Sequence, residues 1–174
     1  MIRDIQKVSD DVIEMKRLIK QKLISDPDIL EALNNPEIDI DSPDEFLDKN
    51  IFGFIRIPQT QDTVRNFICF TVSDIENRFQ SNEVMKTQYI QFNVICHLED
   101  MTTQYSMDRH DLLGYLIRDT FNWTNIFGLQ FKLISNEESA VDSDYYCRIL
   151  KFKAEKLNSL NKARMDNPYD RTRS

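Results

Sequence analysis

Apolar residues recur at helical spacing near the N-terminus. Six of them, three or four positions apart, form one stripe: Ile5, Val8, Val12, Met15, Ile19 and Leu23. This period predicts a long amphipathic helix that ends near Ile24. Asp26 and Pro27 indicate the N-cap and first turn of a short second helix, which the Asn-Asn-Pro sequence at positions 34–36 ends. Residues 1–35 are therefore expected to be an N-terminal helical segment.

Residues 36–58 combine an acidic insert with a β-prone segment. Ser42 and Glu45 have the spacing at which two side chains cap each other's backbone amides, so we expect one helical turn there. From Ile51 to Ile57 the sequence IFGFIRI is apolar, and Pro58 closes it. Because proline is tolerated at a sheet edge, this segment is predicted to be an edge strand that covers the core or meets a neighbour.

The middle of the chain shows the two-residue period of a β-strand. One set of positions is apolar: Ile90, Phe92, Val94, Cys96 and Leu98. The set between them is mostly polar: Gln91, Asn93, Ile95, His97 and Glu99. The alternation predicts a strand in an antiparallel sheet, with one face buried against the core (the dry face) and the other exposed to solvent (the wet face). Its expected hairpin partner is Phe67 to Val72, followed by a long polar connection from Ser73 to Lys86.

A helical period returns before Asn122. Its apolar positions are Leu112, Leu113, Leu116, Ile117 and Phe121. This helix, starting at Ser106 or Asp108, is expected to cover the dry face of the sheet, with Gly114 allowing close packing. Trp123, Ile126 and Phe127 are expected to seal its end. Two strands follow, residues 129–134 and 145–154, joined by the loop SNEESAVDSD as a second hairpin.

These elements predict an α+β fold with a largely antiparallel sheet of four to five strands and helices packed on one face. Residues 1–155 are expected to form a single domain. Apolar residues become sparse after Glu155, and residues 156–174 are predicted to be an extended C-terminal tail or arm.

Composition excludes most motif-bearing enzymes. The only glycines are Gly53, Gly114 and Gly128, where an average usage of about 7% would give roughly twelve. They lie too far apart for a phosphate-binding loop or a hydrolase nucleophile elbow, so no cofactor is expected. Two histidines and three scattered cysteines do not have the spacing of a zinc site.

The compartment follows from the cysteines and the N-terminus. An odd number of cysteines without close spacing favours a reduced, intracellular protein. The first residues, MIRDIQKVSDD, lack the apolar run of a signal peptide, and no stretch reaches the ~18 apolar residues of a membrane span.

Candidate catalytic groups are sparse. Cys96 and His97 are adjacent on a predicted strand and point to opposite faces, so they cannot form a nucleophile pair there. His110 is interpreted as part of a solvated helix face. The acidic groups lack the glycine and terminal glutamate of a calcium loop: Asp39, Asp41 and Asp44, then Glu137, Glu138, Asp142 and Asp144. A small enzyme that uses such carboxylates is the last-ranked alternative; we assign no catalytic or metal-binding residue.

Charge is distributed unevenly. The chain carries a net charge of -7, made up of -12 from Met1 to Cys147 and +5 from Arg148 to Ser174. An acidic body disfavours general nucleic-acid binding. The basic segment either solubilises the chain or docks on an acidic neighbour, such as the body of an identical copy. The candidate subunit or partner contacts are therefore Phe52, Phe54, Arg148, Lys151, Lys153, Lys156, Lys162 and Arg164.

The order of elements resembles that of the tail-terminator and neck proteins of tailed bacteriophages. The likeness covers about residues 5 to 155. It rests on the strand YIQFNVICHLED, the helix RHDLLGYLIRDTFN, and the strands GLQFKLIS and YYCRILKF. The acidic insert and the C-terminal tail depart from the family pattern.

This resemblance implies a non-enzymatic ring subunit of the virion, assembled in the host cytoplasm. Members of the family form rings, commonly hexameric, that cap the tail tube and join it to the head-connector or portal proteins. The resemblance also implies that DNA passes through the ring without specific binding, which an acidic lumen would favour. Two alternatives stay open: a head-completion ring protein on the same axis, and a non-viral protein-interaction module.

Overall fold

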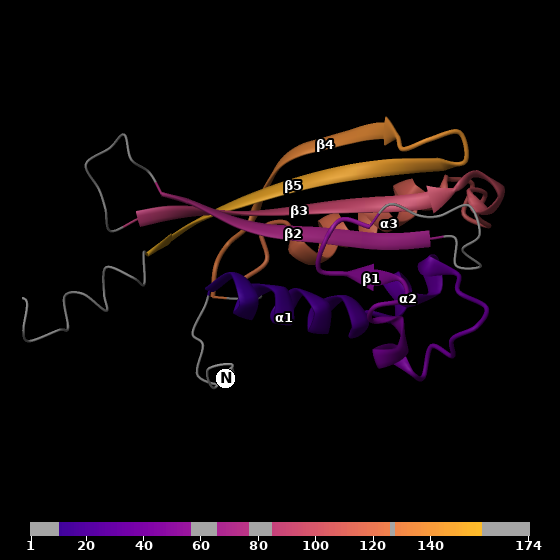
Figure 1. Ribbon diagram of the computed structural model, residues 1–174, viewed down its shortest axis with the longest axis horizontal. Coiled ribbons are helices and arrows are strands. Elements are labelled where there is room, and N and C mark those ends of the chain that lie inside the picture. Colours follow the sequence, from indigo (N-terminus) through magenta and orange to yellow (C-terminus); the bar gives the residue numbers. More distant parts are fainter. Residues whose placement is uncertain (1–10, 57–65, 77–84, 126–127, 158–174) are drawn as a thin grey trace, which may run out of the picture.

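The computed structural model describes residues 11–56, 66–76, 85–125 and 128–157 (Figure 1). Its helices are α1 (Asp11–Ile24), α2 (Pro27–Leu33) and α3 (Arg109–Phe121), with short 3-10 turns η2 (Pro43–Phe46) and η3 (Leu98–Asp100). Its strands are β1 (Ile51–Phe52), β2 (Asn66–Glu76), β3 (Met85–His97), β4 (Lys132–Ala140) and β5 (Tyr145–Leu157).

The strands form one sheet in the order β1-β2-β3-β5-β4. Both predicted hairpins, β2–β3 and β4–β5, are present and antiparallel, and β3 also pairs antiparallel with β5. Only β1 runs parallel to its neighbour β2. The α+β prediction is thus confirmed, with a mixed sheet in place of a purely antiparallel one.

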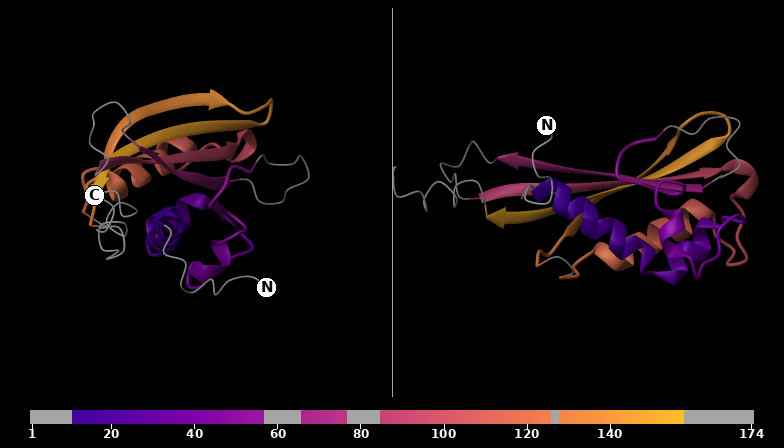
Figure 2. Two further views of the ribbon diagram at one scale, coloured as in Figure 1. Left: turned by 60° about the vertical axis from the view of Figure 1, so that its left-hand side comes forward. Right: turned by 60° about the horizontal axis from the view of Figure 1, so that its bottom comes forward.

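All three helices lie on the same side of the sheet (Figure 2). The predicted dry face of β3 meets them: Ile90, Phe92, Val94 and Cys96 are fully buried. Phe92 is central, because its ring lies 4.9 Å from that of Phe121 on α3 and 5.8 Å from that of Phe152 on β5. Burial of such rings is a main source of stability in a core of this kind.

Helix α2 begins and ends as the sequence predicts. The Asp26 carboxylate accepts hydrogen bonds from the amides of Asp28 and Ile29, and Pro27 occupies the first turn. At the other end Asn34 adopts a left-handed conformation (φ 49°), which asparagine tolerates better than most residues. The expected turn at η2 also forms, but the Ser42 side chain makes no capping bond.

Two predicted connections are wrong because strands continue into them. In the segment expected to link the first hairpin, β2 extends to Glu76, which pairs with Lys86. In the expected loop SNEESAVDSD, β4 continues to Ala140. Side chains from Asn136 to Ala140 are exposed, so this edge strand carries no apolar alternation that could have revealed it.

The face of the sheet away from the helices is more buried than predicted. Asn93 and Ile95 are buried, whereas Leu98 leaves the strand in η3 and is 53% exposed. A second apolar cluster occupies this face: Phe52, Phe67, Cys69, Ile95, Tyr145 and Cys147. The Arg56 guanidinium lies over the rings of Phe52 and Phe67, at 4.9 and 5.4 Å from their centroids. A row of aromatic side chains and a stacked cation therefore covers part of the predicted wet face.

The end of α3 also differs from the prediction. Trp123 is 55% exposed and does not seal the helix; the buried residues there are Phe121 and Phe131. Among the described helices, none has the length and apolar character needed to span a membrane. Predictions for some residues lie outside the described residues: Ile5, Val8, Ile57, Ile126, Phe127, Lys162 and Arg164.

Candidate functional site

The sheet ends in an open edge on each side. Within the described ranges β1 pairs only with Ile68 and Cys69 of β2, so residues 70–76 of β2 have a strand neighbour on one side only. On the opposite side β4 (Lys132–Ala140) pairs with β5, and no other strand of the described part of the chain pairs with it (Figure 1). Unpaired backbone donors and acceptors along an edge are a template for another strand.

Each open edge carries an exposed isoleucine. Ile75 on β2 is 54% exposed, and Ile134 on β4 is 45% exposed. Ile134 lies where the register between β4 and β5 shifts, between Leu133 and Ser135. Sequence analysis missed Ile75 because it fell in a predicted connection. The available signal was an isolated apolar residue within a polar run.

The predicted aromatic contacts occupy different environments. Phe52 is 4% exposed and belongs to the second cluster, whereas Phe54 is 55% exposed. Their ring centroids lie 5.5 Å apart, edge to face. Ile55, which follows Phe54, is 45% exposed. Phe54 and Ile55 therefore form an exposed apolar surface just after β1, at the edge of the sheet that β1 and β2 form. The ring of the buried Phe52 packs against that of Phe54.

The predicted basic contacts are also separated. Arg148 lies on the helix-facing side of β5, where its guanidinium donates to Asn136 Oδ1 (2.9 Å), Glu138 (2.6 Å) and Asp111. Its charge is thus engaged within the chain. Lys151 and Lys153 are half-buried and lie on the other face of the sheet. Lys156, near the end of β5, is also half-buried.

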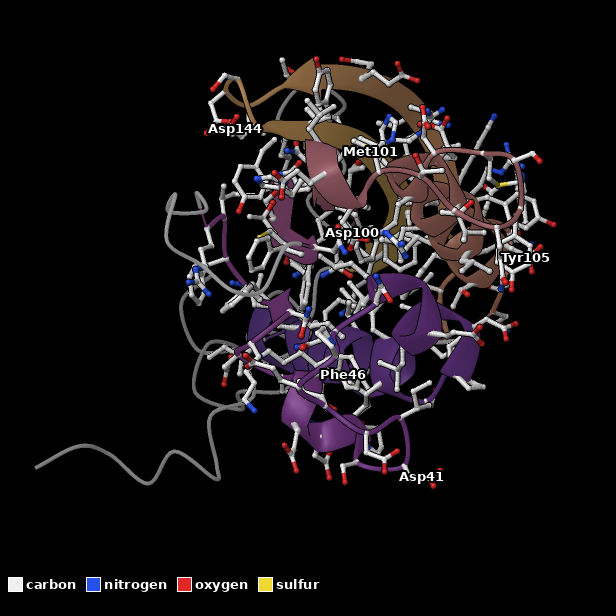
Figure 3. The ribbon with its side chains drawn as sticks, turned by 90° about the vertical axis from the view of Figure 1, so that its right-hand side faces the viewer. Asp41, Phe46, Asp100, Met101, Tyr105 and Asp144 are labelled. Carbon is white, nitrogen blue, oxygen red and sulfur yellow. The ribbon has the colours of Figure 1, made fainter. Side chains whose placement is uncertain are left out.

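A groove of about 530 Å³ lies between α2, α3 and the segment before α3. Ala32, Leu112 and Leu116 line it, with Asp28 and Glu31 adding negative charge. Tyr105, at its wall, is 55% exposed and visible at the side of the molecule in Figure 3. The groove combines apolar and acidic side chains, and its basic lining residue, Arg109, is paired with Asp100. This lining suits a protein segment or a cation-bearing ligand better than an anion.

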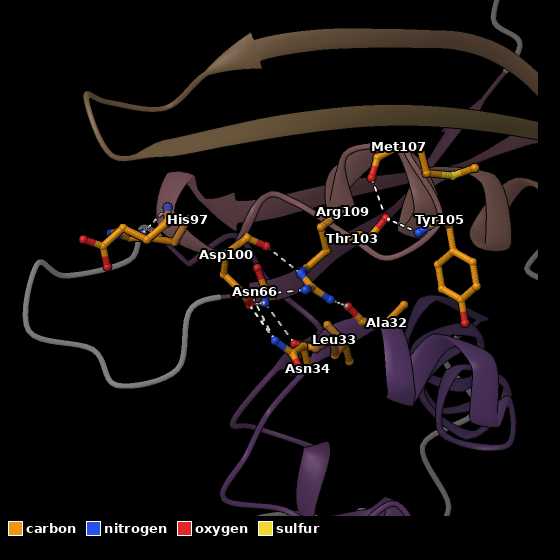
Figure 4. A network of polar contacts seen from close by, with 11 residues as sticks. Ala32, Leu33, Asn34, Asn66, His97, Asp100, Thr103, Tyr105, Met107 and Arg109 are labelled. Atoms are coloured by element: carbon orange, nitrogen blue, oxygen red, sulfur yellow. Dashed lines mark hydrogen bonds and ion pairs between the residues drawn. The ribbon is translucent and has the colours of Figure 1, made fainter.

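A buried polar network fixes the base of this groove (Figure 4). The Arg109 side chain donates to the Ala32 carbonyl (2.9 Å), the Asp100 carbonyl (2.7 Å) and the Asp100 carboxylate (3.1 Å). Asn34 and Asn66 also donate to Asp100, at 2.9 and 2.5 Å. These bonds tie α2, β2 and the start of α3 together. The groove is therefore held by a network whose members sequence reasoning did not identify.

Three metal-ligating side chains come together in the described residues at the start of α3. Asp108, His110 and Asp111 offer donor atoms within 4.8 Å of one another. The positive end of the helix and the Arg148 guanidinium bound to Asp111 both disfavour a cation there. His110 is only 7% exposed, so its assignment to a solvated face is wrong. The first turn of α3 packs against the segment after β3, where the Arg109 amide donates to the Met101 carbonyl (2.7 Å).

The thiols are poor nucleophiles. Cys69, Cys96 and Cys147 are free and buried, and burial raises the pKa of each thiol, that of Cys147 to about 12. A thiol protonated at neutral pH is unreactive. Cys96 faces the helices, away from the adjacent His97, whose Nδ1 accepts a hydrogen bond from the Glu99 amide (3.1 Å). The two residues do not form a catalytic pair.

Comparisons with known proteins give one family. A search of curated proteins finds no match. The model of the YomW family matches residues 26–154, from the N-cap of α2 almost to the end of β5. That range includes α2, α3 and the sheet with both of its open edges. The chain therefore belongs to the YomW family, a protein family of a Bacillus phage SPBeta region, and is a phage-associated protein.

Proposed function

We propose that the protein is a non-enzymatic structural subunit of a phage particle that assembles into a ring at the neck, as a tail terminator. One observation carries the proposal: among the described residues no strand pairs with either outer edge of the sheet, and each of these edges exposes an isoleucine. An exposed apolar residue on the unpaired edge of a strand favours association with another chain.

Two different edges favour a closed ring over a simple dimer. If one edge of a subunit meets the other edge of the next, each contact is heterologous, and its repetition gives a ring when the rotation closes and an open filament when it does not. The strand-to-strand bonds would supply affinity and the side chains beside them specificity. The resemblance to neck proteins favours six copies.

The charge distribution fits passage of DNA. Residues 1–147 carry a net charge of -12, and Glu137 and Glu138 on β4 are exposed. A lumen lined by such a body would repel the phosphate backbone, so a duplex would slide through without being held. The proposed partners are further copies of this chain, the tail tube and the head-connector or portal proteins, in a virion assembled in the host cytoplasm.

A head-completion ring on the same axis is the second candidate. The same two edges would serve either ring, and the phage association favours both over a non-viral interaction module. The two differ in the partner that they bind first. A tail terminator would bind purified tails that lack it, whereas a head-completion protein would bind DNA-filled heads.

Two measurements test the proposal. Light scattering on the purified full chain is expected to give six times the 20.7 kDa of one copy, and antibody labelling of phage particles is expected to mark the junction of head and tail. A monomer at every concentration together with unlabelled particles would contradict the proposal. Antibody label at the distal end of the tail would contradict only the assignment to the neck and not the assignment to the phage particle.

A further inference from the structure

We infer that the groove between α2 and α3 binds the basic C-terminal segment, residues 169–173, of a neighbouring copy in the ring. The inference rests on the proposed function, because it needs a second copy, and it adds a contact that does not involve the sheet edges. It draws on the charge of the groove, the sequence of the segment and the reach of the chain beyond β5.

The unpaired charges of the groove are negative. Asp28 and Glu31 lie three positions apart on α2, and within the described part of the chain neither exposed carboxylate makes an ion pair. Residues at this spacing share one face of a helix, with Cβ atoms about 5 to 6 Å apart. Arg109, the basic residue of the lining, is already held by Asp100. The groove therefore presents two neighbouring negative charges that a cationic segment can meet.

Apolar side chains lie beside these charges. Leu112 and Leu116 of α3 are only half-buried, and Tyr105 at the side of the groove is exposed (Figure 3). The Arg109 network ties α2 to the start of α3 (Figure 4), so both sides of the groove are held in place. A formed apolar groove with a few charged groups suits a peptide that carries apolar and basic anchors.

The C-terminal segment carries such anchors at regular spacing. Residues 169–173 read Tyr-Asp-Arg-Thr-Arg. In an extended peptide alternate side chains point the same way, so Tyr169, Arg171 and Arg173 would share one side of the bound segment. The two arginines would then lie about 7 Å apart, close to the spacing of the two carboxylates on α2. Tyrosine and arginine are also among the residues that most often anchor protein interfaces.

The reach of the chain favours the groove of a second copy. β5 runs away from the α2 end of the sheet (Figure 1) and stops at Leu157, seven positions past the residue that pairs with Phe92. Helix α3 packs on Phe92 through Phe121, and the groove begins five residues earlier, at Leu116. The way back from Leu157 to the groove of the same copy is therefore about 30 Å.

Residues 158–168 are too few for that return. A reversal of direction takes about four residues in a turn. The remaining seven of these eleven residues span at most about 25 Å when fully extended. Tyr169 therefore falls short of the groove of its own copy, and a neighbouring copy is the occupant's source.

A segment of this size is a weak contact by itself. Five residues bury much less surface than the roughly 1,200 Å² at which stable interfaces begin. Once the sheet edges hold two copies together, docking takes place at a high effective concentration. The segment is therefore expected to strengthen rings, and not to assemble copies whose edges are blocked.

Charge reversal on the full chain tests the pairing. Asp28→Lys with Glu31→Lys reverses the groove, and Arg171→Glu with Arg173→Glu reverses the segment. Each reversal is expected to raise the concentration at which rings dissociate by about tenfold, because like charges then face each other. Light scattering at low salt measures this concentration. The chain with all four substitutions is expected to dissociate within about threefold of the natural chain, because the charges match again.

A matched control changes the net charge equally outside the groove. Asp39→Lys with Asp41→Lys replaces two exposed acids of the segment between α2 and η2. This chain should dissociate within about twofold of the natural one, as surface substitutions away from a contact do. Urea unfolding of every variant checks that the fold is kept.

Crosslinking identifies the copy whose groove is filled. Ser174→Cys chains are mixed with Gln104→Cys chains, whose cysteine lies in the groove lining at an exposed position, and treated with a short bismaleimide. The native thiols are buried with a raised pKa, so the engineered ones react first. The mixture is expected to give crosslinked pairs of chains. Lys49→Cys, exposed outside the groove lining, replaces Gln104→Cys in the control and should give few.

A chain that carries both Gln104→Cys and Ser174→Cys, diluted with natural chains, reports docking within one copy. Restoration by the combined charges, with crosslinks between chains, supports the inference. A groove reversal no worse than the control, a lack of restoration, or crosslinks confined to single chains would overturn it. Rings that all variants form equally well would overturn it and leave the proposed function standing. A natural chain that is monomeric at every concentration would contradict both.

Discussion

Gly114 of α3 lies directly against Arg148 of β5. A Cβ atom at position 114 would come within 2.8 Å of Arg148 Cδ, a distance at which one of the two groups must move. Arg148 has little freedom to do so, because its guanidinium is bound by Asp111, Glu138 and Asn136. A glycine in the middle of a helix, unfavourable by itself, is therefore explained by the packing of α3 on the sheet.

The effect of Gly114→Ala is expected to change sign with the residue at position 148. In the natural chain the new methyl group displaces Arg148 and lowers the free energy of unfolding by about 1 kcal/mol, as overpacking does. In an Arg148→Ala background the space is open, and the same substitution should raise it by about 1 kcal/mol through helix propensity. Urea unfolding of the four proteins measures the coupling. Equal effects in both backgrounds would refute the packing argument.

Arg109 is expected to be a major determinant of stability. It is 8% exposed and bonds to Ala32 and Asp100, so Arg109→Met leaves the Asp100 carboxylate and a buried carbonyl without this partner. We expect the free energy of unfolding to fall by about 3 kcal/mol. Arg118→Met on the exposed face of the same helix is the matched control and should change it by less than about 0.5 kcal/mol. Similar losses in both variants would mean that the buried network contributes little.

The two N-cap positions allow a paired test. Asp26 caps α2 and also accepts a hydrogen bond from the Thr120 hydroxyl (3.2 Å), so Asp26→Ala should lower the free energy of unfolding by about 1 to 2 kcal/mol. Ser42 occupies the same position at η2 without a capping bond, and Ser42→Ala should have almost no effect. Thermal unfolding followed by circular dichroism provides the comparison. A larger loss at Ser42 than at Asp26 would contradict it.

The buried thiols predict a loss of stability at alkaline pH. The pKa of Cys147 is raised from an ordinary 9.0 to about 12. Above pH 9 the unfolded chain therefore loses this proton while the folded chain keeps it. The contribution is fully present below pH 9 and is lost progressively as the pH rises from 9 towards 12.

Substitution of the thiol measures this contribution. Cys147→Ala should unfold with a weaker dependence on pH between 9 and 11 than the natural chain, although its overall stability is lower. In the native protein at pH 8 all three thiols should resist a disulfide reagent such as dithionitrobenzoate and react once urea unfolds the chain. Rapid reaction of the folded protein would show that the thiols are accessible.

Local patterns predicted the elements whose signals are continuous in the sequence. Asp26 and Pro27 fixed the start of α2, and the alternation through Ile90, Phe92 and Val94 identified β3 and its buried face. The polar half of β4 had no such signal, because an edge strand with both faces exposed does not alternate. This half of β4 is a strand because it pairs with β5. A short stretch of sequence around β4 does not reveal that pairing.

The candidate site was less predictable for a related reason. Arg109 binds Ala32 and Asp100, 77 and 9 positions away, and nothing in its own neighbourhood indicates burial. Arg148 was grouped with the basic tail on charge, yet its partners Asp111 and Glu138 hold it within the fold. Charge counted along the chain does not show which charges are already paired. The edges become visible only when the order of all five strands is known.

Blocking one edge at a time isolates the proposed ring contact. A lysine on an edge strand opposes pairing, so Ile75→Lys should disable the β2 edge and Ile134→Lys the β4 edge. Each variant alone is expected to be a 20.7 kDa monomer with unchanged unfolding, because both isoleucines are exposed. Ile40→Lys, at an exposed isoleucine in the segment between α2 and η2, is the control and should still form rings.

The most direct measurement is the mass of an equimolar mixture of the Ile75→Lys and Ile134→Lys chains by light scattering. One intact β4 edge then meets one intact β2 edge, and both outer edges are blocked. Head-to-tail assembly predicts a species of twice the chain mass that grows no further. Rings formed by either variant alone, or a mixture that stays monomeric while the natural chain forms rings, would contradict the account.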